Sequence, residues 1–123
     1  MASSNDHLVQ AQGNESFYED IGADRSSTPE WAMTILFYAA LHYAQAALIH
    51  LQGTGPGDHK ERKQAIRTTF GAIAPDYESL EDASRRARYE CERPKRDELQ
   101  AAQQLVRGIA NEIAKTAPPA SYA

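Results

Sequence analysis

The sequence predicts an all-α protein, an antiparallel four-helix bundle preceded by a disordered acidic tail. Three observations predict this class. Apolar residues recur at spacings of three and four, proline or glycine interrupts the pattern at the expected helix ends, and no segment alternates with the period of two typical of strands. The 123 residues, 41% apolar and 24% charged, suit one soluble domain. We expect the bundle over residues 28–117, with residues 1–27 and 118–123 disordered.

The N-terminal tail is polar and acidic. The first 30 residues carry six acids and one base, and Phe17, Tyr18 and Ile21 are their only compact apolar group. Such a segment buries too little apolar surface to compensate for the entropy of ordering it. Its removal is therefore expected to leave helicity and thermal stability almost unchanged.

The first helix is expected to begin at Ser27–Glu30 and to end near Gln52, before a glycine-rich loop. Its start combines a capping hydroxyl, a proline in the first turn and a glutamate three residues after Ser27. The segment 31–57 has no charged residue and is long enough to span a bilayer, but it contains His42 and Gln45. A helix buried on most of its circumference explains this pattern better.

Three shorter helices are expected to follow. Asp58 caps the first of them, with Glu61 as its reciprocal partner, and Pro75 ends it. Asp76 caps the next, and Pro94 ends it before the last helix begins. Their apolar stripes are Ile66, Phe70 and Ile73; then Tyr77, Leu80, Ser84, Ala87 and Cys91; and finally Leu99, Ala102, Val106, Ile109 and Ile113.

Basic residues are concentrated in the middle of the chain. The net charge is −4, yet ten of the thirteen lysines and arginines lie between Lys60 and Arg96. On a helical wheel Tyr89 points away from the core among arginines, which suits base stacking or a dimer contact. The alternatives are an ordinary solvated face and, for Tyr89, packing under the tail. The candidate RNA- or nucleotide-binding residues are Lys60, Lys63, Arg67, Arg85, Arg88 and Tyr89.

His59 and Arg62 fall on the same side of their helix as the apolar stripe. Both could satisfy loop carbonyls at the rim of the bundle. The functional alternative makes His59 the general base of a ribonuclease, with Arg62 and Arg88 neutralising the scissile phosphate. These three are the candidate catalytic residues.

Several classes of site are not expected. A single cysteine, Cys91, excludes an internal disulfide and favours a reducing cytoplasm, and its place on a stripe predicts a packing role. His42 and His50 are too far apart along a helix to share a metal. The first ten residues do not resemble a signal peptide. We therefore expect no metal, no cofactor and no membrane.

The order of these fragments resembles the HEPN superfamily (higher eukaryotes and prokaryotes nucleotide-binding domain). The resemblance rests on Phe37–His42 and Ala44–Ala47 in a long helix, a glycine loop, His59 opening the next helix, and Ala87–Tyr89. It covers residues 30–117. It implies a helical bundle, usually homodimeric, in toxin–antitoxin, phage-defence or RNA-processing systems. Many such domains are metal-independent ribonucleases, and others are non-catalytic partners of nucleotidyltransferases.

This chain departs from the catalytic branch of that family, which has an arginine followed four to six residues later by a histidine. No arginine stands in that relation to any of the four histidines, and His59 and Arg62 run in the opposite order. Ala47, Leu48 and His50 also stand where many relatives have Glu and Lys. The resemblance thus implies the fold, the dimer and an Arg88–Tyr89 surface, but not the nuclease activity.

Three functional hypotheses follow. The first is a cytoplasmic HEPN-like module that binds RNA, a nucleotide or a protein partner, such as an antitoxin or a nucleotidyltransferase. The second is a metal-independent endoribonuclease with a non-standard His, Arg and Tyr site. The third is a purely structural dimer that uses the apolar stripe of the last helix. A homodimer is expected because the first and last helices offer more apolar surface than a small domain buries alone.

Overall fold

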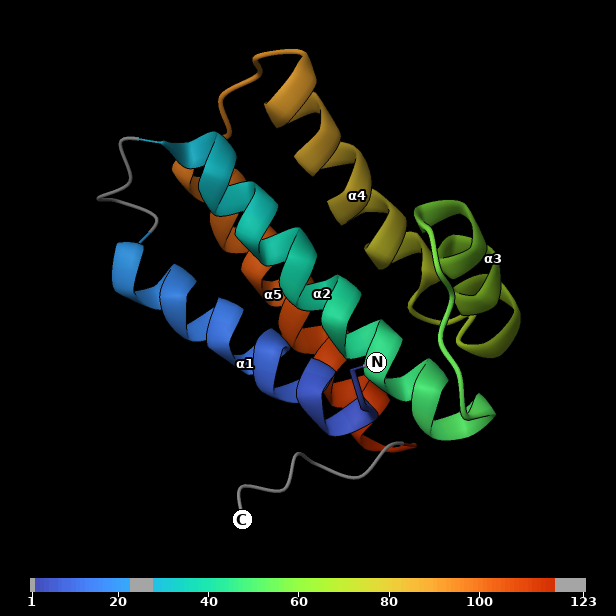
Figure 1. Ribbon diagram of the computed structural model, residues 1–123. Coiled ribbons are helices and arrows are strands. Elements are labelled where there is room, and N and C mark those ends of the chain that lie inside the picture. Colours follow the sequence, from blue (N-terminus) through green and yellow to red (C-terminus); the bar gives the residue numbers. More distant parts are fainter. Residues whose placement is uncertain (1, 23–27, 117–123) are drawn as a thin grey trace.

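A computed structural model describes residues 2–22 and 28–116. The described part contains five helices and no strand, which confirms the all-α class (Figure 1). The helices are α1 (Ser4–Ile21), α2 (Pro29–Gln52), α3 (His59–Thr69), α4 (Ala74–Tyr89) and α5 (Arg96–Ala114). The expected disordered end over residues 118–123 and the expected capping residue Ser27 lie outside the described residues.

Helix α2 is the centre of the bundle. Fourteen of its 24 residues are buried, and α1, α4 and α5 lie lengthwise against it while the short α3 lies near its C-terminal end (Figure 1). By length and composition α2 could cross a membrane, but most of its apolar window is buried by the other helices. A central core helix explains the uncharged stretch.

The N-terminal segment is a helix, which corrects the expectation of a disordered tail. The Ser3 hydroxyl accepts a hydrogen bond from the Asp6 N–H at 3.1 Å, and the Asp6 carboxylate accepts one from the Ser3 N–H at 2.8 Å. This capping box stabilises the N-terminal end of α1. Leu8, Ala11 and Tyr18 are then buried along the bundle. Their spacing of three and seven was too sparse to be recognised as a stripe.

A polar cluster fastens α1 to its neighbours. The Glu15 carboxylate of α1 accepts a hydrogen bond from the Tyr43 hydroxyl of α2. It also accepts two hydrogen bonds from Arg107 of α5, one from Nε and one from a terminal nitrogen, both at 2.7 Å. Burial and the hydrogen bond to Glu15 raise the pKa of Tyr43. This Glu15 cluster (Glu15, Tyr43 and Arg107) joins three helices that are distant in sequence.

The boundary between α3 and α4 differs from the prediction. Helix α3 ends at Thr69, and α4 starts at Ala74 with Pro75 in its first turn. Proline is tolerated at this position because the N–H of a first-turn residue has no acceptor within the helix, and proline lacks that N–H. Pro75 therefore opens α4 instead of ending α3, and Asp76 lies inside the helix instead of capping it.

Cys91 is not the core residue that its spacing predicted. Helix α4 ends at Tyr89, and Cys91 is exposed with a left-handed φ of 56°. The N–H groups of both Glu90 and Glu92 converge on the Arg86 carbonyl, at 2.9 and 3.4 Å, so the chain turns away from the helix before position 91. The other four members of that stripe are buried.

The predicted stripe of the last helix is confirmed, since all five of its residues are buried in α5. They pack within the chain, mainly against α2. This face is therefore not available to a second copy of the chain. The exposed apolar surface from which the homodimer was predicted is not present on α5. The homodimer itself stays a prediction.

Candidate ligand-binding cleft

A cleft of about 1470 Å³ opens between α3 and α4. All six candidate binding residues line it, together with the candidate base His59; Phe37 and Gln52 of α2 also contribute. Arg62 does not line it. The six are Lys60, Lys63, Arg67, Arg85, Arg88 and Tyr89.

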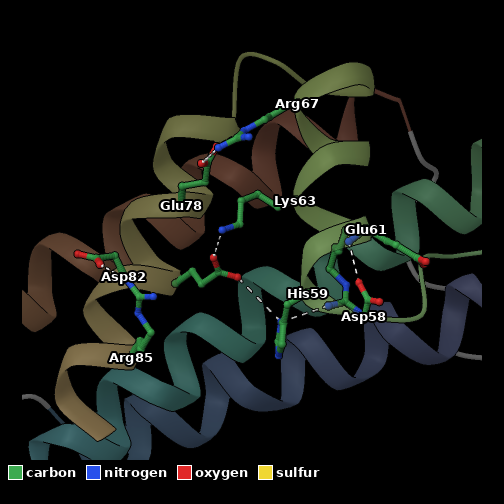
Figure 2. A network of polar contacts seen from close by, with 10 residues as sticks. Asp58, His59, Glu61, Lys63, Arg67, Glu78, Asp82 and Arg85 are labelled. Atoms are coloured by element: carbon green, nitrogen blue, oxygen red, sulfur yellow. Dashed lines mark hydrogen bonds and ion pairs between the residues drawn. The ribbon is translucent and has the colours of Figure 1, made fainter. Parts of the chain in front are cut away.

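The start of α3 sets the orientation of the first wall. As predicted, the Asp58 side chain caps the helix by accepting a hydrogen bond from the Glu61 N–H at 2.8 Å. The Glu61 carboxylate, however, accepts its hydrogen bond from the Gly57 N–H and not from the Asp58 N–H. From this fixed start, Lys63 and Arg67 follow one turn apart on the same face. Figure 2 shows both side chains extending from α3 toward α4.

Ion pairs bridge the cleft. The Lys63 Nζ lies 2.8 Å from Glu81 of α4, and the Arg67 Nε donates to Glu78 at 3.0 Å (Figure 2). The hydrogen bond from Arg67 holds the pKa of the Glu78 carboxyl below its usual range. Like charges one turn apart on α3 are thus tolerated because each faces a carboxylate of α4.

The cleft is therefore balanced in charge instead of basic. Its lining contains five lysines and arginines, and also five acids: Asp58, Glu61, Glu78, Glu81 and Asp82. Arg85 pairs with Asp82 at 3.0 Å, which holds the Asp82 pKa low. Within the described ranges, Lys60 and Arg88 pair with no carboxylate. These two are the cations most available to an anionic ligand.

Tyr89 is the most exposed aromatic residue at the cleft, with 74% of its surface accessible. This agrees with the outward orientation predicted from the wheel. The Arg88 guanidinium lies 5.2 Å from the centre of the Tyr89 ring, while its Nε donates to the Ser84 carbonyl at 3.3 Å. Arg88 thus covers the Tyr89 ring within a cation–π distance.

Arg62 is buried beneath the cleft, with 8% of its surface exposed. Its Nε donates to the Gln45 side chain at 2.9 Å, and Gln45 in turn donates to the Pro56 carbonyl at 3.0 Å. The sequence allowed Arg62 to bind loop carbonyls at the rim of the bundle. In the structure Arg62 reaches the Pro56 carbonyl only indirectly, through the Gln45 side chain. Gly55 is required there, because an added Cβ would approach the Gln45 amide to 2.2 Å.

His59 lies at the mouth of the cleft with a half-exposed side chain. Its Nδ1 is 3.4 Å from an Arg62 nitrogen and 4.0 Å from Glu81, and its ring lies 6.0 Å from Phe37. The structure thus brings His59 beside Arg62, while Arg62 is engaged with Gln45 below. His59 and Arg88 both line the cleft and Arg62 does not, so the cleft contains two of the three candidate catalytic residues.

The sequence did not predict that acids of α4 face Lys63 and Arg67, nor that Gln45 holds Arg62. Glu78 and Glu81, three residues apart on α4, were a readable signal because i and i+3 share a face. Gln45 had no local signal, since its partner Arg62 is 17 residues away. In the part of the chain that the structure describes, no group of three His, Cys, Asp or Glu side chains could hold a metal ion.

No protein-family model, no curated protein and no solved structure matches this chain.

Proposed function

We propose that this chain is a HEPN-like, non-catalytic binding module of a toxin–antitoxin or phage-defence system, and that it takes a nucleotide or the end of a single-stranded RNA in the cleft between α3 and α4. The observation that carries the proposal is Tyr89, exposed at the cleft beside Arg88. An exposed aromatic face next to a guanidinium suits a nucleobase and its phosphate.

The balance of charges in the cleft limits the size of the anionic ligand that it can bind. Lys60 and Arg88 are the cleft cations without a carboxylate partner in the described residues, while Lys63 and Arg67 are already paired. A long polyanion would have to displace Glu78 and Glu81. One or two phosphates need only the two available cations, so mononucleotides and short strands fit better than a duplex.

The test is a titration of the full chain with adenosine monophosphate and with a six-nucleotide single-stranded RNA. Tyr89→Ala should weaken binding by about 1–3 kcal/mol, the usual loss of one stacked base. Tyr89→Phe should retain it. The matched control is Trp31→Ala, since Trp31 is an aromatic residue of α2, 57% exposed and outside the cleft.

Two other outcomes would redirect the proposal. Cleavage of the RNA in EDTA, lost in His59→Ala with binding intact, would favour the metal-independent nuclease. Absence of binding to either probe at low salt would reject the nucleotide function. The mixed charges around Tyr89 would then favour a protein partner, because interface hot spots are rich in Tyr and Arg.

A further inference from the structure

A histidine pair lies in the seam between α1 and α2. The Nδ1 atoms of His7 and His42 are 2.9 Å apart, and the ring planes differ by 26°. The ring centres are 5.1 Å apart, close to the largest separation that this N–N distance permits, so the rings meet edge to edge. Such an in-plane contact is a hydrogen bond in which one Nδ1 carries a proton and the other supplies a lone pair.

The bond depends on how many protons the pair holds. In the neutral pair one facing nitrogen is a donor and the other an acceptor. One added proton turns the donor ring into an imidazolium and keeps the bond. A second added proton places N–H groups on both facing nitrogens, which removes the acceptor and brings two cations into contact. The doubly protonated pair therefore cannot remain as it is.

The surroundings oppose that protonation. Burial lowers the pKa of His7 and of His42, and the guanidinium of Arg62 on α3 lowers both further. His7 also lowers the pKa of His42, while Asp6 on α1 acts in the other direction on His7. Both groups therefore bind protons less readily with α1 docked than they would as free side chains.

Helix α1 packs lengthwise along α2, and only part of that contact is apolar. Its buried residues are Leu8, Ala11 and Tyr18. Apart from the Glu15 cluster and the histidine pair, its docking contacts include one from the Ser4 hydroxyl, which donates to the Ala46 carbonyl at 2.7 Å. Polar contacts thus act beside apolar burial in docking α1, and loss of one of them shifts the docking equilibrium.

We propose that α1 is a pH-sensitive cover on α2, released when the His7–His42 pair takes up its second proton. The released state binds protons with the ordinary histidine pKa near 6.5, and the docked state binds them only at lower pH. Docking is consequently full above pH 6.5 and weakens as the pH falls below it. Each linked proton changes the docking equilibrium by up to tenfold per pH unit, and two protons by up to a hundredfold.

Hydrogen–deuterium exchange of the full chain at pH 7.5 and 5.0, corrected for the intrinsic rate of each amide, tests this inference. We expect the opening of α1 amides to rise at least tenfold relative to α5 amides at pH 5.0. Both histidines should titrate below pH 6.5 when followed by NMR in the unmodified protein. An unchanged ratio of α1 to α5 protection would overturn the proposal, as would ordinary titration of both rings.

Variants separate the pair from general acid effects. The double variant His7→Gln, His42→Gln retains polar side chains but takes up no proton, and its pH response should fall below twofold. The control variant His50→Gln changes the exposed histidine of α2, and its pH response should equal that of the unmodified protein. Arg107→Gln should loosen α1 at both pH values and leave their ratio unchanged. A full pH response in the double variant would overturn the proposal.

Discussion

Helices α1 and α5 both lie along α2, but they are held there by different chemistry. Six residues of α5 are buried, and their spacing forms a continuous apolar stripe. Helix α1 buries three residues, and its contacts with the other helices include the Glu15 cluster, the histidine pair and one hydroxyl. Apolar burial does not depend on pH, whereas carboxylate and imidazole contacts do. The docking of α5 is therefore expected to be independent of pH, whereas the docking of α1 is expected to depend on it.

The first prediction concerns removal of α1. Deleting residues 2–22 exposes the buried face of α2 that α1 covers and removes the burial of Leu8 and Tyr18, each worth about 1.5–3 kcal/mol. In a domain of this size the midpoint of thermal unfolding should fall by about 20 °C. Circular dichroism against temperature measures it. A change of less than about 5 °C would restore the sequence-based expectation that this segment is dispensable.

The second prediction compares single core truncations. Ile109→Ala in α5 removes a fully buried side chain and should cost about 3–4 kcal/mol of unfolding free energy in urea. Leu8→Ala in α1 should cost about 2 kcal/mol, since its site lies at the edge of the core and can relax. Equal losses at the two positions would show that α1 belongs to the core as fully as α5.

The third prediction concerns the Glu15 cluster. Arg107→Gln removes two hydrogen bonds to Glu15 and should cost about 1–2 kcal/mol, above the usual range for exposed pairs because Glu15 is nearly buried and the geometry is bidentate. Urea unfolding measures the loss. The control is Lys115→Gln, whose exposed pair with Glu112 lies within α5 and should contribute less than about 0.5 kcal/mol.

The smallest effect is expected on the outer face of α1. Phe17 is a large apolar residue but mostly exposed, and Phe17→Ser should change the unfolding free energy by less than about 0.5 kcal/mol. Tyr18→Ser, one position along, should be the matched contrast, because Tyr18 is buried. A similar loss at both positions would mean that the apolar group of Phe17, Tyr18 and Ile21 packs as a unit.

The same difference explains how much of the fold was predictable. Spacings of three and four located the buried stripes of α3, α4 and α5, because in those helices the stripe itself makes the contact, while α2 was located by its capping signals and its uncharged stretch. Helix α1 was missed since its buried apolar residues are few and widely spaced and several of the other residues that dock it are polar. Glu15, Tyr43 and Arg107 form a cluster only after three helices are assembled, and periodicity within one segment does not detect such a cluster.

The candidate cleft was predictable in its residues but not in its charge. The concentration of bases identified Lys60, Lys63 and Arg67 as candidates, and the helical wheel placed Tyr89 outside the core. It could not pair them with Glu78 and Glu81, which belong to the next helix and are matched only by tertiary packing. Counting bases along the chain therefore predicted a basic surface where the fold makes a balanced one.

The ion pairs across the cleft act as built-in competitors of any phosphate ligand. A phosphate that takes Lys63 or Arg67 replaces a carboxylate, so that exchange releases no condensed counterion and leaves the salt dependence of binding flat. A phosphate on Lys60 or Arg88 does release one, at about 0.7 of a logarithmic unit in single strands. The slope of affinity against salt would thus report which cations a ligand has recruited, with no structure of the complex in hand.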